Sequence, residues 1–134
     1  MIKQCLILVS ISLLSLHAFG AHVGFQQFQL YEGTSRPLNT SVWYPTTQDN
    51  PTETIAENIA FVGTQVIKNA SILSSKTRLV VLSHGYRGNW KNLNWLASRL
   101  AHNGYVVASV NHPGTTTFNT SPDLAKQWCS GPMI

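Results

Sequence analysis

The sequence predicts an α/β fold in which an antiparallel hairpin is followed by a parallel strand-helix-strand unit. Residues 23–30 and 38–44 alternate apolar and polar side chains on either side of the turn sequence Glu32–Ser35, which is typical of a hairpin. Leu79–Leu82 and Tyr105–Val110 are continuous apolar runs, typical of parallel strands that are buried on both faces. Between these runs, apolar residues recur at helical spacing.

The first twenty residues predict a secretory signal peptide. Lys3 precedes the apolar run Cys5–Leu16, and Ala18-Phe19-Gly20 places small residues at alternate positions, as in a cleavage site. The run is shorter than the roughly 20 residues of a membrane-spanning helix, so no stable membrane span is expected. Cleavage after Gly20 leaves residues 21–134 as one partial domain, secreted or periplasmic.

Composition indicates a globular chain. Hydrophobic residues make up 43% of the 134 residues and charged residues 10%, which excludes a disordered charged tail. The net charge is +4, but the basic residues are scattered rather than interleaved with aromatic residues, so no nucleic-acid partner is expected. Outside the predicted signal peptide the one cysteine is Cys129, so no internal disulfide is expected.

The expected hairpin has one irregularity. In residues 23–30 the apolar phase slips at Gln26-Gln27, which predicts a β-bulge. The second strand, residues 38–44, ends before Pro45. Because polar and apolar side chains alternate along both strands, one face of the hairpin is expected to be solvated.

Residues 52–68 follow the hairpin and predict a short helix. The apolar residues at roughly helical spacing are Ile55, Ile59, Val62 and Val66. Gly63 interrupts the pattern.

The helix of the strand-helix-strand unit has clear ends. Asn89 or Asn92 can cap its start, and Asn103-Gly104 suits its end. Its apolar positions are Leu93, Leu96, Ala97, Leu100 and Ala101. The two parallel strands are expected to leave an edge open for further strands, which predicts poor solubility.

The loop Ser83–Trp90 follows the first buried strand. Ligands bind beyond the carboxyl ends of strands in open α/β sheets, and this loop occupies such an end. Gly85 and Gly88 let the backbone turn and expose its N–H groups. Fixed N–H groups of this kind can form an oxyanion hole.

Several stretches together resemble the α/β-hydrolase superfamily, and most closely its platelet-activating-factor acetylhydrolase and dienelactone-hydrolase-like branch. The resemblance covers residues 36 to 118 and rests on Arg36–Leu38, Val42–Pro45, Phe61–Gly63, Leu79–Gly85, the helix up to Gly104, and Tyr105–Gly114. It implies that the backbone N–H of Tyr86 is one oxyanion donor and that Gly85 permits the turn. It also implies that His112 and Gly114 lie near the substrate entrance, with no cofactor.

The nucleophile of such hydrolases is missing from the sequence. They need a serine within Gly-x-Ser-x-Gly on a strand-to-helix turn, followed by an acid and a histidine. No serine after Gly20 has glycine at both positions, and no histidine follows His112. Ser83 is a poor substitute, because a glycine-rich loop rather than a helix follows it. We therefore expect the N-terminal portion of an exported serine hydrolase acting on small-molecule carboxylic esters, inactive by itself.

Two alternatives remain. One is a non-catalytic secreted binding module on the same α/β scaffold, and the other is a complete small enzyme that uses Ser83 with His84 or His112. Without such a role, His84 is expected to support its loop by hydrogen bonding. Zinc sites combine histidine with cysteine or carboxylate ligands at short spacing. No such ligands accompany His84, His102 and His112, so no metal is expected.

Overall fold

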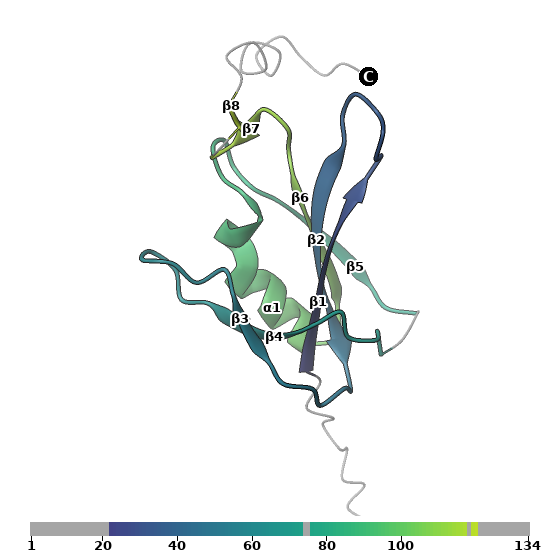
Figure 1. Cartoon of the computed structure of the whole chain (residues 1–134). Helices are drawn as coiled ribbons and strands as arrows, with labels where there is room; N and C mark the ends of the chain where they lie inside the picture. The colour runs from purple at the N-terminus through teal and green to yellow at the C-terminus, as the bar shows by residue number, and fades with distance from the viewer. Residues whose placement is uncertain (1–21, 74–75, 118, 121–134) are drawn as a thin grey trace, which may run out of the picture.

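The computed structural model describes residues 22–73, 76–117 and 119–120, so the predicted signal peptide and Cys129 lie outside the described residues. Figure 1 shows a twisted sheet with one α-helix on one of its faces. The elements in chain order are β1 (His22–Leu30), β2 (Leu38–Thr46), β3 (Glu53–Ile55), β4 (Thr64–Lys68), β5 (Leu79–Ser83), the 3-10 helix η1 (Trp90–Leu93), α1 (Asn94–His102), β6 (Val106–Asn111), β7 (Thr115–Thr116) and β8 (Asn119–Thr120).

The main sheet has the strand order β3-β4-β1-β2-β6-β5, and β7 pairs with β8 in a separate two-stranded sheet. Strands β5 and β6 are parallel, and β6 also pairs with β2 in the antiparallel sense. The predicted hairpin and strand-helix-strand unit are therefore both present. In the described part of the chain, no helix has the length and apolar character needed to cross a membrane.

The hairpin of β1 and β2 has no bulge, so that prediction was wrong. Its register is continuous from His22 opposite Thr46 to Leu30 opposite Leu38. The apolar phase slips because the apolar residues of the two halves of β1 lie on opposite faces: Phe25 is buried in the core, whereas Phe28 on the other face is 45% exposed. Exposed apolar residues on the second face thus produce the same sequence pattern as a bulge.

The helix expected between residues 52 and 68 is also absent. This segment forms the antiparallel pair β3 and β4, and Ile55 and Val66 are the expected helical positions that become buried. Ile59 and Val62 lie in the connection and are among the most exposed apolar side chains. β-branched residues favour strands when a sheet edge is available, and here β4 adds in parallel to β1.

The predicted end of the helix at Asn103-Gly104 is confirmed, whereas its predicted start belongs to a preceding 3-10 helix. Asn89 caps η1 rather than α1: its side chain accepts from the N–H of Lys91, and the Asn92 side chain accepts from the N–H of Asn89. The chain continues directly from η1 into α1. At the other end Gly104 has φ +90°, which is the left-handed conformation that glycine adopts without strain.

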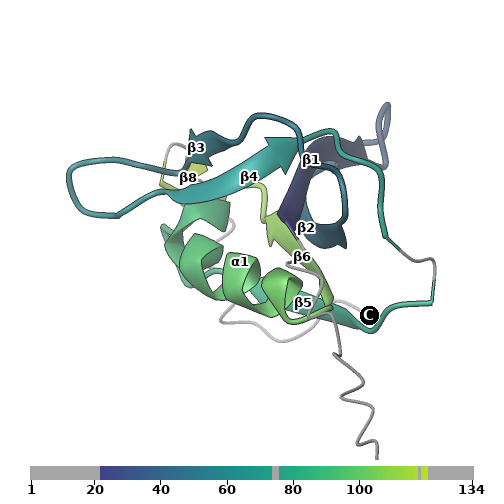
Figure 2. The same ribbon diagram turned by 90° about the horizontal axis from the view of Figure 1, so that it is seen from below.

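The core lies between α1 and one face of the sheet. Figure 2 shows from below how the helix lies along that face. Ala97 and Ala101 are fully buried against this face, and their small size lets the helix approach the strands closely. The sheet contributes Val23, Phe25, Trp43, Val66 and Val107.

The opposite face of β5 is uncovered in the described part of the chain. Leu79 and Val81 are 62% and 63% exposed, so the expectation that this strand is buried on both faces was wrong. In contrast, β2 is buried on both faces near its end, where Trp43 faces the helix and Tyr44 donates from its hydroxyl to the Ala70 carbonyl at 2.7 Å. The expected solvated face of the hairpin is therefore restricted to its turn end.

A buried amide joins the helix to two strands. The Oδ1 atom of Asn94, a residue only 2% exposed, accepts from the indole N–H of Trp43 at 3.3 Å and from the hydroxyl of Thr64 at 3.0 Å. A buried donor that loses its acceptor costs its full desolvation energy. Asn94 therefore satisfies one buried and one half-buried donor at the start of α1.

We predict that Asn94→Ala lowers the free energy of unfolding by about 2 kcal/mol, because it leaves the Trp43 N–H unsatisfied. Asn39→Ala is the matched control, since the exposed Asn39 amide bonds only in a surface pair with Gln29; its effect should stay within about 0.5 kcal/mol. Urea unfolding followed by tryptophan fluorescence measures both. Equal losses for the two variants would contradict the role assigned to Asn94.

Candidate functional site

Two loops meet at the carboxyl ends of β5 and β6. The N–H of Arg87, in the loop after β5, donates to the carbonyl of Thr115 at 2.8 Å, and the N–H of Thr117 donates to the carbonyl of Gly88 at 3.2 Å. The hydroxyl of Thr117 also donates to the carbonyl of Arg87 at 2.6 Å. In Figure 1 this end of the sheet lies beside β7 and β8. The loop after β5 is therefore anchored to the chain that follows β6.

His84 supports this arrangement from inside. Its side chain is 7% exposed, its Nδ1 lies 2.9 Å from the Gly85 carbonyl, and its Nε2 lies 3.2 Å from the backbone nitrogen of His112. Because the His112 N–H is a donor, Nε2 must accept and Nδ1 must carry the proton. Through these two contacts His84 links both loops, which agrees with the supporting role expected for it.

Ser83 and His112 form a second contact between the loops. The Ser83 hydroxyl oxygen lies 2.8 Å from His112 Nε2, and the rings of His84 and His112 are 5.1 Å apart. Burial lowers the pKa of His112 below its usual value of 6.5, and the nearby His84 and Arg36 lower it further. The lowered pKa favours the neutral form of His112, and a neutral imidazole nitrogen can accept the proton of a hydroxyl.

From the sequence, the pair of Ser83 and His112 was only an alternative to a nucleophile elsewhere. The register of β5 and β6 explains why the two residues meet. Ser83 pairs with Val110 across the parallel strands. His112 follows Val110 by two positions and so projects from the same face of the sheet. The register can be obtained only once the pairing of the two strands is known.

The backbone around Tyr86 leaves donors free. Among the hydrogen bonds of the described residues, none uses the N–H of Gly85 or Tyr86 as donor, whereas the N–H groups of Arg87 and Gly88 are both engaged. The Tyr86 side chain is 65% exposed. Two adjacent N–H groups at the end of β5 are therefore available to bind a ligand. The next two residues of the loop are held in place by backbone hydrogen bonds.

The two predicted glycine positions differ in what they require. A Cβ at Gly85 would meet open space, and the left-handed residue in this loop is Arg87, with φ 60°. Gly85 thus keeps access to the loop open rather than enabling an unusual turn. Gly114 has φ 80°, a left-handed conformation that favours glycine. It is also buried, which restricts its own contact with a ligand.

The described residues contain no group of three or more histidine, cysteine or acidic side chains that could hold a metal ion. His84 and His112 are close together, whereas His102 ends α1 and lines a different surface. The three histidines weighed in the sequence are therefore not one cluster.

Comparison with known proteins finds a similar fold among solved structures. No protein-family model and no curated protein matches this sequence. Among solved structures, the chain is similar to a ferulic acid esterase from Streptomyces cinnamoneus, with a TM-score of 0.62 and 23% identity over 72% of this chain. The match spans 35% of the esterase chain. The similarity confirms the predicted fold class, an α/β fold with part of a hydrolase sheet.

The lowered pKa of His112 predicts how stability depends on pH. Folding favours the neutral ring of His112, so the neutral ring adds to the free energy of unfolding. This stabilisation is fully present above pH 6.5, the usual pKa, and is lost as the pH falls through the lower pKa of the folded state. An NMR titration of the His112 imidazole should give a midpoint below 6.5.

The same prediction can be checked by unfolding the protein in urea at a series of pH values from about 8 to 5. His112→Gln should flatten the decrease in stability toward low pH. A midpoint above the usual value, or an unchanged slope in His112→Gln, would show that the fold does not favour the neutral ring.

Proposed function

We propose that this chain is the N-terminal portion of an exported hydrolase whose complete form cleaves small carboxylic esters through an acyl-serine intermediate. The observation that carries the proposal is the pair of unused N–H groups at Gly85 and Tyr86, at the carboxyl end of a parallel strand. Supporting it are the fold shared with an esterase and the 35% of that esterase's length that the match spans.

The proposed role of Tyr86 is electrostatic. When a nucleophile attacks an ester carbonyl, negative charge develops on the oxygen, and a fixed N–H donor stabilises it without having to reorganise. The Tyr86 N–H would be one such donor, with open space at Gly85 for the approaching ester. The anchored Arg87 and Gly88 would keep the donor in place.

The second donor and the nucleophile would come from further chain. The main sheet ends at β5 in the described residues, and a parallel strand added there would bring its own carboxyl end beside the Tyr86 loop. A serine on the turn after that strand, with the N–H of the following residue, would complete the site. His112, which is half-buried, would lie at the substrate entrance, with the buried Gly114 shaping its loop.

The branch and the location are part of the same proposal. The motifs around Ser83–Gly85 and His112–Gly114 favour an acetylhydrolase or dienelactone-hydrolase-like esterase. Residues 1–20 would direct export, to the periplasm or the medium. Cleavage after Gly20 would leave Ala21 as the first residue, which N-terminal sequencing of the exported protein detects.

One geometric observation favours a second candidate, a small esterase that uses Ser83 itself. With the Ser83 oxygen 2.8 Å from His112 Nε2, the imidazole could take the hydroxyl proton while the oxygen attacks the ester carbon. The proton would then pass to the departing alkoxide, and water would release the acid from the acyl-serine. One observation argues against this second candidate. The nucleophilic serine of such hydrolases lies on a turn that leads directly from a strand into a helix, whereas after Ser83 the first helix, η1, begins only at Trp90.

A fluorophosphonate probe distinguishes the two candidates. We expect no serine of the purified 134-residue chain to be labelled, and hydrolysis of p-nitrophenyl acetate no faster than with the same concentration of free histidine. Labelling that disappears in Ser83→Ala and weakens in His112→Gln would replace the first candidate with the second. A non-catalytic binding module would instead be favoured by an unreactive chain that unfolds cooperatively on heating without any added segment.

The proposed oxyanion donor can be tested once the coding sequence beyond codon 134 is read in its three forward frames. We expect a Gly-x-Ser-x-Gly motif there. In the chain extended through that motif, Tyr86→Pro removes the N–H and should lower kcat by about 10²- to 10³-fold, whereas Tyr86→Phe keeps it and should retain activity. Circular dichroism checks that both variants fold. Absence of the motif in every frame, or full activity in folded Tyr86→Pro, would refute the proposal.

A further inference from the structure

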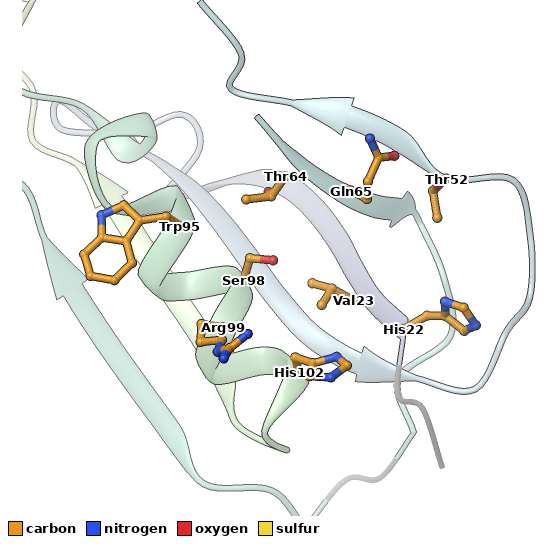
Figure 3. Close-up of a pocket in the computed structure, with 9 residues that line it drawn as sticks. All are labelled: His22, Val23, Thr52, Thr64, Gln65, Trp95, Ser98, Arg99 and His102. Carbon is orange, nitrogen blue, oxygen red and sulfur yellow. The ribbon is translucent and has the colours of Figure 1, made fainter. Parts of the chain in front are cut away.

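An open groove runs along α1 on the helix-covered side of the sheet. Its volume is about 480 Å³, and α1, β1 and β4 contribute most of its lining (Figure 3). None of its lining residues belongs to the loops after β5 and β6. The groove is therefore separate from the candidate site that contains Tyr86.

One stripe of α1 faces this groove. Trp95, Ser98, Arg99 and His102 all line it, and their spacing of three, four and seven residues places them on one side of the helix. A stripe of this spacing that faces a neighbouring strand is usually apolar. Here it presents a hydroxyl, a guanidinium and an imidazole, all of which can donate hydrogen bonds.

The charge of the lining has one sign. Every titratable side chain that lines the groove is basic, namely Arg99, His22 and His102. Within the described residues the Arg99 guanidinium forms no ion pair. The lining residue His22 pairs with Asp49, whose Oδ1 lies 3.6 Å from His22 Nε2 and whose side chain is 93% exposed.

The groove also offers apolar surface of two kinds. Val23 lies beneath it and is 8% exposed, and the Trp95 indole is 61% exposed. Trp95 and Arg99 are one helical turn apart, so a planar group could stack on the indole while an attached anion reaches the guanidinium. Arginine binds a carboxylate with two parallel hydrogen bonds, and the hydroxyl of Ser98 lies on the same lining.

We infer that this groove binds a small organic carboxylate that carries a planar apolar group. Arg99 pairs with the carboxylate, and Trp95 contacts the planar group. The inference rests on the groove residues alone and does not depend on the proposed ester hydrolysis.

The test uses 2-naphthoate as probe, with 2-naphthylmethanol as its neutral counterpart and acetate as the anion without a ring. Titration of the purified protein, followed by NMR, should show saturable shifts of the Trp95 indole N–H and the Arg99 side chain with 2-naphthoate. Acetate and 2-naphthylmethanol should bind at least about tenfold more weakly, since each lacks one of the two contacts.

Variants assign the contacts. Arg99→Gln should weaken 2-naphthoate binding by about tenfold or more, as expected when a charged hydrogen bond is lost, and Trp95→Ala should weaken it as well. Arg78→Gln is the matched control, because Arg78 is exposed and lies before β5, outside the groove; its affinity should equal that of the parent protein. Both groove residues are exposed, so the variants should fold, which thermal unfolding verifies.

Three outcomes would overturn the inference. The first is the absence of saturable binding of 2-naphthoate to the parent protein at millimolar concentration. The second is equal affinity for the alcohol, which would show that the anion is not recognised. The third is an equal loss in Arg78→Gln and Arg99→Gln, which would indicate attraction by overall charge rather than by this groove.

Discussion

Packing around Trp43 is the constraint on which the rest of the structure depends. This side chain is fully buried in the middle of β2, with its ring centroid 5.1 Å from that of Phe25 and 5.8 Å from that of Trp90. Its indole N–H needs an acceptor inside the core, and Asn94 provides one at the start of α1. One residue therefore sets the positions of β1, η1 and α1 relative to β2.

This packing reaches the candidate site through Trp90. The Trp90 ring lies against the core aromatics, and its backbone N–H donates to the side chain of Asn111 at 2.9 Å, at the end of β6. The loop that begins after Ser83 is thus held at its far end by the core and by β6. Within it, His84 and Arg87 are bonded to the chain after β6, which leaves Gly85 and Tyr86 as the exposed segment between fixed points.

The elements that the sequence predicted well are those whose signal is local. The apolar runs of β5 and β6, the helix between them and the turn of the first hairpin depend on spacing within a few residues. The β3-β4 pair was missed because Ile55 and Val66 fit either a helix or two strands, and only the free edge of β1 decides between them. The exposure of Val81 was missed because a strand sequence does not reveal whether a second layer covers it. Likewise, the contact between Ser83 and His112 depends on strand register.

The order of strands in the sheet also constrains the order of events during synthesis. β5 precedes β6 in the chain, but β6 lies between β2 and β5. Strand β5 therefore has no partner in the hairpin. Its backbone groups stay unpaired until the ribosome has released the chain as far as Asn111, the end of β6. At roughly 5–20 residues per second, this leaves the segment Leu79–Ser83 without a partner for a few seconds. During that interval its five uncharged residues stay exposed as an extended, mostly apolar segment.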